Sequence, residues 1–112
     1  MPILKIQTNT SLDDAESFRK EASSFVSEML GKPENYVMIV LEQSDIMFAG
    51  KNDPAAWMEL KSIGLPEDRT ADFSEKLCDF ILEKTGIPKA RIYIEFTSTE
   101  RNMLGWDGKT FG

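Results

Sequence analysis

Residues 31–42 read GKPENYVMIVLE, and residues 86–97 repeat this pattern as GIPKARIYIEFT. Each stretch begins with a glycine and a proline, which together are typical of the end of a helix. Each then continues into a run of the length and composition of a β-strand, which is predicted to begin at Tyr36 in the first stretch and at Arg91 in the second. A single shift along the chain, which carries Gly31 onto Gly86 and Pro33 onto Pro88, superimposes the two stretches. We therefore predict that the chain contains one β-α-β unit twice.

An amphipathic helical pattern precedes both stretches. Apolar residues recur there at spacings of three and four, which places them on one face of a helix. The first stripe consists of Phe18, Ala22, Phe25, Val26 and Met29. The same shift aligns it with a second stripe, Phe73, Leu77, Phe80 and Ile81. Ser11, with Asp14 three residues later, resembles a capping box and is predicted to cap the first helix.

A further strand candidate lies ahead of each helix, PILKIQT at residues 2–8 and AWMELKSI at residues 56–63. The chain is thus interpreted as a single domain, 1–112, built from pseudo-repeats of about 2–55 and 56–112. Each unit joins two parallel strands through a right-handed helical crossover. We predict an α+β fold of two layers, in which a four-stranded mixed sheet carries both helices on one face.

The second face of this sheet has no helix to cover it. The strand predicted to begin at Tyr36 has apolar side chains on both faces, from Tyr36 to Leu41. Sheets that are apolar on both faces are normally covered on both. Large exposed apolar patches indicate interaction sites. We therefore expect several copies of the chain to associate through this face.

Composition excludes several classes of protein. The chain has a formal net charge of -6 and lacks the basic stripe that binding to nucleic acid requires. No apolar run is long enough for a membrane span, and charged residues interrupt any signal-peptide core. Cys78 is the only cysteine, so no disulfide can form within the chain. These features predict a cytoplasmic protein without nucleic-acid or membrane partners.

The chain contains no histidine. This absence excludes a Ser-His or Cys-His nucleophile and a histidine metal site. The carboxylates also lack the spacing of a calcium loop, so we expect neither a metal nor a cofactor. Among the remaining groups, the α-amino group has the reference pKa closest to neutrality, about 8. It is the leading candidate for acid–base chemistry near pH 7.

Other candidate residues are ambiguous when each is taken alone. Lys32 fits either a cation at a helix C-terminus or an anchor for a carboxylate. Gly64 marks a strand end or gives a ligand access to the backbone N–H of Ile63. Cys78 is best interpreted as a small buried apolar residue. Trp106 and Phe111 either fix a glycine-rich tail to the core or form the wall of a pocket.

Strand alternation places Tyr93 and Glu95 on the face opposite Ile92 and Ile94. They are either ordinary exposed residues or parts of a surface that association would bury. Taken together, the ordered motifs of the chain resemble the macrophage migration inhibitory factor family of the tautomerase superfamily. The motifs are Met1-Pro2 with TNT at 8–10, GKP at 31–33, SIG at 62–64, RIYI at 91–94, and GW and TF at 105–106 and 110–111.

The resemblance implies a homotrimer of β-α-β-β-α-β subunits with active sites between subunits. It further implies a tautomerase acting on a small aromatic 2-keto acid, with the amine of Pro2 as catalytic base after Met1 is removed. Lys32 and the backbone N–H of Ile63 would bind the substrate, and Tyr93 would enter from the neighbouring subunit. Apolar pocket walls would come from Ile3, Tyr36, Trp106 and Phe111.

Two departures from the family pattern matter. The Cys-x-x-Cys that family members often carry is replaced by Ala55-Ala56-Trp57-Met58, so thiol–disulfide activity should be absent. Glu95, counted with the substrate-binding residues, stands where the family usually has an asparagine. An ionised Glu95 would disfavour a carboxylate substrate and favour a protonated Pro2 amine, unless Arg91 or Lys32 neutralises it.

Three functions are consistent with the sequence. The first is a keto–enol tautomerase of the phenylpyruvate type. The second is a cytokine-like binding protein of the same fold with weak or vestigial tautomerase activity. The third is a degenerate relative whose site no longer works, which Glu95 favours.

Overall fold

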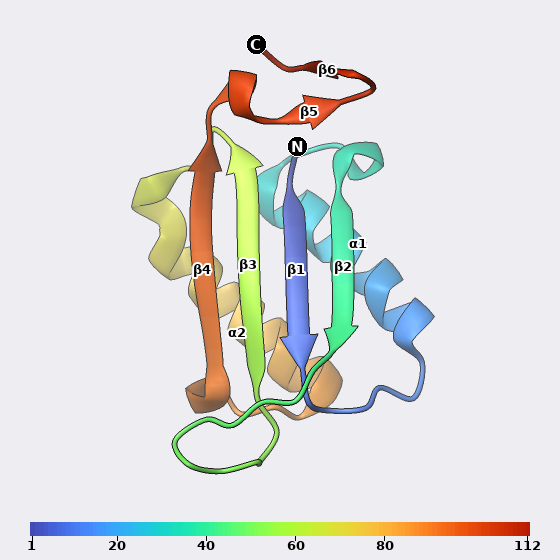
Figure 1. Ribbon diagram of the computed structural model, residues 1–112, viewed down its shortest axis with the longest axis vertical. Coiled ribbons are helices and arrows are strands. Elements are labelled where there is room, and N and C mark those ends of the chain that lie inside the picture. The colour runs from blue at the N-terminus through green and yellow to red at the C-terminus, as the bar shows by residue number, and fades with distance from the viewer.

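The computed structural model describes residues 1–112 and contains two α-helices and one principal sheet (Figure 1). The principal elements are β1 (Ile3–Thr8), α1 (Ala15–Leu30), β2 (Met38–Gln43), β3 (Ala56–Ile63), α2 (Thr70–Thr85) and β4 (Ile92–Thr99). A small hairpin of β5 (Gly105–Trp106) and β6 (Lys109–Thr110) follows them. Four short 3-10 turns complete the chain: η1 (Glu34–Tyr36), η2 (Glu67–Arg69), η3 (Lys89–Arg91) and η4 (Arg101–Met103).

The four long strands form one mixed sheet in the order β2-β1-β3-β4. Within each repeat the strands are parallel, β1 with β2 and β3 with β4, whereas β1 and β3 join the repeats in antiparallel fashion. Both helices lie behind the sheet in the view of Figure 1. The predicted two-layer fold with helices on one face is therefore confirmed. Neither α-helix is long and apolar enough to cross a membrane.

The duplication extends to the bounds of the elements. The shift that carries Gly31 onto Gly86 also carries α1 onto α2 and η1 onto η3. Both helices end at a glycine in the left-handed region, Gly31 at φ 65° and Gly86 at φ 79°. Because glycine lacks a Cβ, it adopts this conformation with little steric cost. The predicted helix ends are thus confirmed.

Several predicted boundaries are wrong. The first strand begins at Ile3 rather than Pro2. The second strand begins at Met38 rather than Tyr36, because the backbone N–H of Tyr36 donates to the Pro33 carbonyl at 3.1 Å and closes a 3-10 turn. Arg91 similarly belongs to η3, and β4 begins one residue later. The cap of α1 is Asp14 instead of Ser11. The Asp14 carboxylate accepts the Ser17 backbone N–H at 3.0 Å.

The hydrophobic core lies between the sheet and the helices. Alternate residues of β1 and β3 point into it, and Leu4, Met58 and Leu60 are fully buried there. Phe73 and Leu77 of α2 reach the same core and are also fully buried. Both predicted helical stripes therefore face the sheet, as the three- and four-residue spacing indicates.

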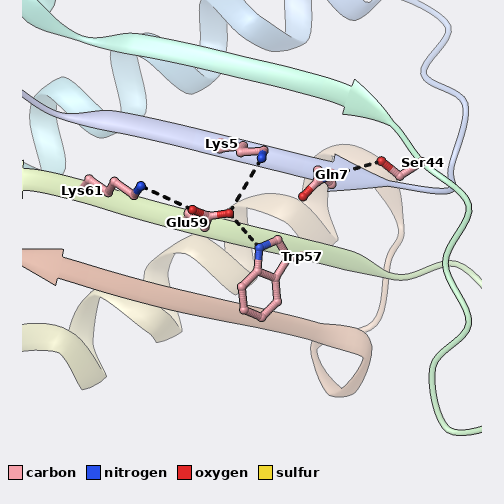
Figure 2. Close-up of polar contacts among 6 residues, drawn as sticks. All are labelled: Lys5, Gln7, Ser44, Trp57, Glu59 and Lys61. Atoms are coloured by element: carbon pink, nitrogen blue, oxygen red, sulfur yellow. Dashed lines mark hydrogen bonds and ion pairs between the residues drawn. The ribbon is translucent and has the colours of Figure 1, made fainter.

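The opposite face of the sheet carries a polar network centred on Glu59 (Figure 2). The Glu59 carboxylate accepts a hydrogen bond from the Trp57 indole N–H at 2.9 Å. The ammonium groups of Lys5 and Lys61 lie 3.9 and 3.7 Å from it. The Trp57 hydrogen bond, reinforced by the two lysines, holds the pKa of Glu59 below its ordinary value. This open face is polar along its middle and apolar toward Met38, which is 57% exposed.

Candidate active site at the N-terminal end of the sheet

The N-terminus lies at one end of the sheet, next to the end of β3. Pro2 is fully buried, and its carbonyl accepts the Met38 backbone N–H at 3.0 Å. Ile3 pairs with Lys61 in the antiparallel register of β1 and β3. Continuing that register sets Met1 beside Ile63. The predicted residues Pro2, Ile3 and Ile63 are therefore close together.

Lys32 reaches this end from the turn that follows α1. Its backbone is fixed in both directions by Ser27: the Lys32 N–H donates to the Ser27 carbonyl at 3.1 Å, and the Ser27 hydroxyl donates to the Lys32 carbonyl at 2.5 Å. The Lys32 side chain is exposed and forms no ion pair within the chain. Its ammonium group is thus free to meet an anion.

Three aromatic rings, which we call the aromatic wall, stand at the same end: Tyr36, Trp106 and Phe111. The Tyr36 and Trp106 rings meet edge-on with centroids 6.2 Å apart. Trp106 and Phe111 are stacked at 6.1 Å with an interplanar angle of 19°. Trp106 is 49% exposed, so the wall presents apolar surface to solvent. Figure 1 shows its hairpin, β5 and β6, at the same end of the sheet as the N-terminus.

Burial, followed by the positive charges of Lys32 and Arg101, lowers the pKa of the Met1 amine from its usual value of about 8. Both effects disfavour the charged form of an amine. Removal of Met1 would transfer the free amine to Pro2, one residue further inward. While Met1 is attached, the Pro2 nitrogen is a peptide amide and cannot act as a base.

Arg101 is a residue of this end that the sequence analysis missed. Its Nε–H donates to the Phe111 carbonyl at 3.0 Å, while the Phe111 N–H donates to the Arg101 carbonyl at 3.1 Å. The hairpin was missed as well. Its turn consists of Asp107 and Gly108, with φ 54° and 77°. An Asp-Gly pair is the strongest short-range signal for such a turn, so this feature was readable in the sequence.

Comparison with known proteins places these features in a family. The family model described as macrophage migration inhibitory factor (MIF) matches residues 1–112. The chain belongs to the MIF family. It is 40% identical over 115 residues to a homolog from Brugia malayi, which covers 100% of both chains. It is 39% identical over 114 residues to a homolog from Trichinella spiralis, which covers 99% of this chain and 100% of that one.

Solved MIF structures have the same fold. A MIF homologue from Prochlorococcus marinus matches with a TM-score of 0.92 and 42% identity, over 98% of this chain and 99% of that chain. The Trichinella spiralis MIF also matches with a TM-score of 0.92, at 37% identity over 97% and 99% of the two chains. The tautomerase fold indicated by the motifs is therefore confirmed.

Two residues attributed to the MIF-type site, Tyr93 and Glu95, lie elsewhere in the protomer. The register of β3 with β4 sets Ser98 beside Ser62. The register of β1 with β3, continued by one residue, sets Ser62 beside Pro2, so Pro2, Ser62 and Ser98 form one row across the sheet. Tyr93 is therefore about 17 Å from that row along the strand, at about 3.3 Å per residue. Glu95 is about 10 Å away by the same measure. Neither side chain joins the N-terminal end within one protomer.

Tyr93 has well-defined surroundings at the far end of the sheet. Its ring packs on Phe48 with centroids 5.1 Å apart, and the Arg91 guanidinium lies 5.0 Å from the Phe48 ring on the same loop. Arg91 also donates hydrogen bonds to the carbonyls of Phe48, Lys51, Asp53 and Pro54. Tyr93 nevertheless remains 60% exposed, so its hydroxyl-bearing ring is available for contact.

Glu95 lacks the neutralising partner that the sequence suggested. Arg91 is occupied by backbone carbonyls, and neither Arg91 nor Lys32 forms an ion pair with it. Its cross-strand neighbour is Glu59, another carboxylate. Like charges directly opposite each other destabilise a sheet. Glu95 is thus an exposed, uncompensated charge on the open face.

Cys78 behaves as the sequence predicts for a packing residue. Its side chain is buried in the core between α2 and the sheet, at 8% exposure. Burial raises the pKa of the Cys78 thiol, which keeps it in the less reactive neutral form. The start of β3, where Ala55 and Ala56 are buried, contains no thiol.

Proposed function

We propose that this chain, after removal of Met1, is a keto–enol tautomerase acting on phenylpyruvate-like 2-keto acids. The observation that supports this most directly is the lowered pKa of the Met1 amine, because the burial and the positive charges that lower it surround the position next to Pro2. A lowered pKa increases the fraction of the amine that is neutral near pH 7, and the neutral form can accept a proton. Its neighbours, a free cation and an apolar wall, suit a substrate with a carboxylate and an aromatic ring.

In this mechanism the Pro2 amine removes a proton from the carbon between the ring and the keto group. Negative charge then develops on the keto oxygen, where the backbone N–H of Ile63 stabilises it, while the Lys32 ammonium holds the substrate carboxylate. The protonated Pro2 amine then delivers this proton to the oxygen, which gives the enol and returns the amine to its neutral form, and the reverse sequence restores the keto form. General acid–base catalysis of this kind contributes about 10²–10⁴-fold.

We further propose that the working unit is a homotrimer in which Tyr93 and Glu95 complete the site of a neighbouring subunit. Two observations support this arrangement. The open face of the sheet exposes apolar groups such as Met38 and Trp57. Tyr93 lies at the end of the sheet opposite the N-terminus, so a second copy is needed to bring the two ends together.

The test is ketonisation of phenylpyruvate by protein whose N-terminus has been defined by intact mass. We expect processed wild-type protein to be active and Pro2→Gly, which replaces the secondary amine by a primary one, to lose kcat/KM, with about 10²–10⁴-fold as the upper limit. The control is the same chain with Met1 retained, which keeps a free α-amine but turns the Pro2 nitrogen into a peptide amide. Comparable turnover by the Met1-bearing chain and the processed chain would rule out the prolyl base.

A further inference from the structure

We propose that Arg101 is a positioning residue of the site, which holds the aromatic wall in place by its two hydrogen bonds with Phe111. This inference rests on the proposed function for its catalytic readout. Its structural part stands on the geometry of the C-terminal segment alone. We call the pair of hydrogen bonds between Arg101 and Phe111 the clasp.

The hairpin that carries Trp106 has little stability of its own. Its strands, β5 and β6, contain two residues each, and a short isolated hairpin is at best marginally stable in water. The clasp supplies the missing restraint from η4. The Arg101 carbonyl accepts the Phe111 N–H at 3.1 Å, and the Arg101 Nε–H donates to the Phe111 carbonyl at 3.0 Å. The Phe111 N–H also lies 3.3 Å from the Leu104 carbonyl, whereas the Phe111 carbonyl is held by the Arg101 side chain.

The clasp passes its restraint to the rest of the wall through ring contacts. Phe111 stacks on Trp106 at 6.1 Å, and Trp106 meets Tyr36 at 6.2 Å. Tyr36 belongs to η1, directly before the strand that pairs with Pro2. Loss of the clasp would free Phe111 first and then Trp106, the ring with the largest exposed face of the wall.

Arg101 has a second effect that can be separated from the first. Its guanidinium forms no ion pair within the chain, so its charge is not neutralised by a carboxylate. That charge is one of the causes of the lowered pKa of the N-terminal amine. The side-chain half of the clasp depends on a donor at Nε, whereas the electrostatic effect depends only on the positive charge; the backbone half is common to every variant.

Three substitutions separate these roles. Arg101→Gln places an amide nitrogen at the position of Nε but removes the charge. Arg101→Lys keeps the charge but has a methylene at that position. Arg101→Met removes both the donor at that position and the charge. Lys109→Gln is the control, because it removes a cation from β6 whose side chain has no partner in the chain.

We expect KM for phenylpyruvate to rise about 2- to 10-fold in Arg101→Met and Arg101→Lys, the effect of one lost hydrogen bond. KM should be unchanged in Arg101→Gln and Lys109→Gln. The pH–rate profile should separate the variants by charge, whereas KM separates them by the donor at the position of Nε. The pKa of the amine should rise in Arg101→Gln and Arg101→Met, which lack the charge, and stay in place in Arg101→Lys.

Fluorescence gives a readout that does not depend on turnover. In a Trp57→Phe background, Trp106 is the only indole, and its emission reports the exposure of the wall. We expect a red shift in Arg101→Met and Arg101→Lys and none in Arg101→Gln. If this pattern appears while every variant lacks activity, the clasp stands and the proposed tautomerase function fails. Emission and KM that do not distinguish Arg101→Met from wild type, or Arg101→Gln from Arg101→Met, would overturn the clasp.

Discussion

The two helix ends of the duplicated unit share one backbone and differ in one side chain. Gly31-Lys32-Pro33 and Gly86-Ile87-Pro88 both pass from a left-handed glycine into a 3-10 turn. At the middle position, Ile87 is 1% exposed and belongs to the core, whereas Lys32 is exposed beside the N-terminus. The backbone therefore follows the same path at both helix ends, whereas the side chain between the glycine and the proline differs in role. One copy serves packing and the other is available for binding.

The largest effect should come from Ile87. Ile87→Ala removes a fully buried side chain and should lower the free energy of unfolding by about 2–5 kcal/mol. The matched substitution Lys32→Ala removes an exposed side chain and should change it by less than about 0.5 kcal/mol. Urea unfolding of the two variants measures the difference directly. Equal losses would show that the two helix ends do not differ in the way described.

Lys32 should show the opposite profile. Lys32→Met keeps the length of the side chain and removes its charge, so it should raise KM for phenylpyruvate about 10- to 100-fold, the value of a charge-assisted hydrogen bond. The midpoint of urea unfolding should stay unchanged. A variant that loses stability but retains its KM would place Lys32 with Ile87 as a packing residue.

Lys32→Met should also move the pH dependence of kcat/KM to higher pH. Lys32 lowers the pKa of the amine, so kcat/KM should rise with pH at a lower pH than an ordinary amine would give. Without this cation the pKa of the amine increases, and the rising limb moves to higher pH. A pH–rate profile of wild type against Lys32→Met measures the displacement. Movement of the limb to lower pH would contradict this electrostatic account.

The glycines test what the helix ends have in common. Nothing lies within 4 Å of a Cβ added at Gly31 or at Gly86, so the cost of alanine there is conformational alone. Gly31→Ala and Gly86→Ala should each cost about 1–2 kcal/mol of folding free energy. Thermal or urea unfolding of both variants gives the comparison. A clear inequality would mean that the two ends are strained to different degrees.

The smallest effect concerns the strands that follow. The shift that relates the two repeats pairs Glu95 in β4 with Val40 in β2. Glu95→Gln removes the like-charge pair with Glu59 and should stabilise the fold by about 0.2–1 kcal/mol. Val40→Ala, which leaves the carboxylates in place, is the control for a change on the same face. Destabilisation by Glu95→Gln would show that an unseen partner already balances this charge.

The sequence predicts this fold well where the signals are local. The glycine–proline ends and the helical stripes needed only neighbouring residues, and they are confirmed. The start of β2 at Tyr36 was wrong, because apolar alternation cannot distinguish a strand from the 3-10 turn that Pro33 begins. The position proposed for the site came from short motifs read together. Arg101 could not be found, because only the folded chain brings the Phe111 carbonyl to its guanidinium.

The separation of Tyr93 from Pro2 also had no local signal. Both residues belong to motifs of the same resemblance, yet the antiparallel meeting of the repeats sends β1 and β4 in opposite directions. Which end of the sheet a residue occupies depends on this register. Cross-strand pairing of that kind joins residues that are distant in the sequence, as in Lys61 with Ile3 and Leu60 with Leu4.

The register of β1 with β3 relates the two repeats by a local two-fold axis. Ile3 pairs with Lys61 and Ile6 with Met58, and the shift that relates the repeats exchanges these two pairs. The seam is therefore isologous, like the contact across the two-fold axis of a homodimer. A single copy of the unit would expose the edge of its first strand, and the same edge of a second copy could pair with it. The two repeats are thus related like the two subunits of a homodimer, although their sequences differ.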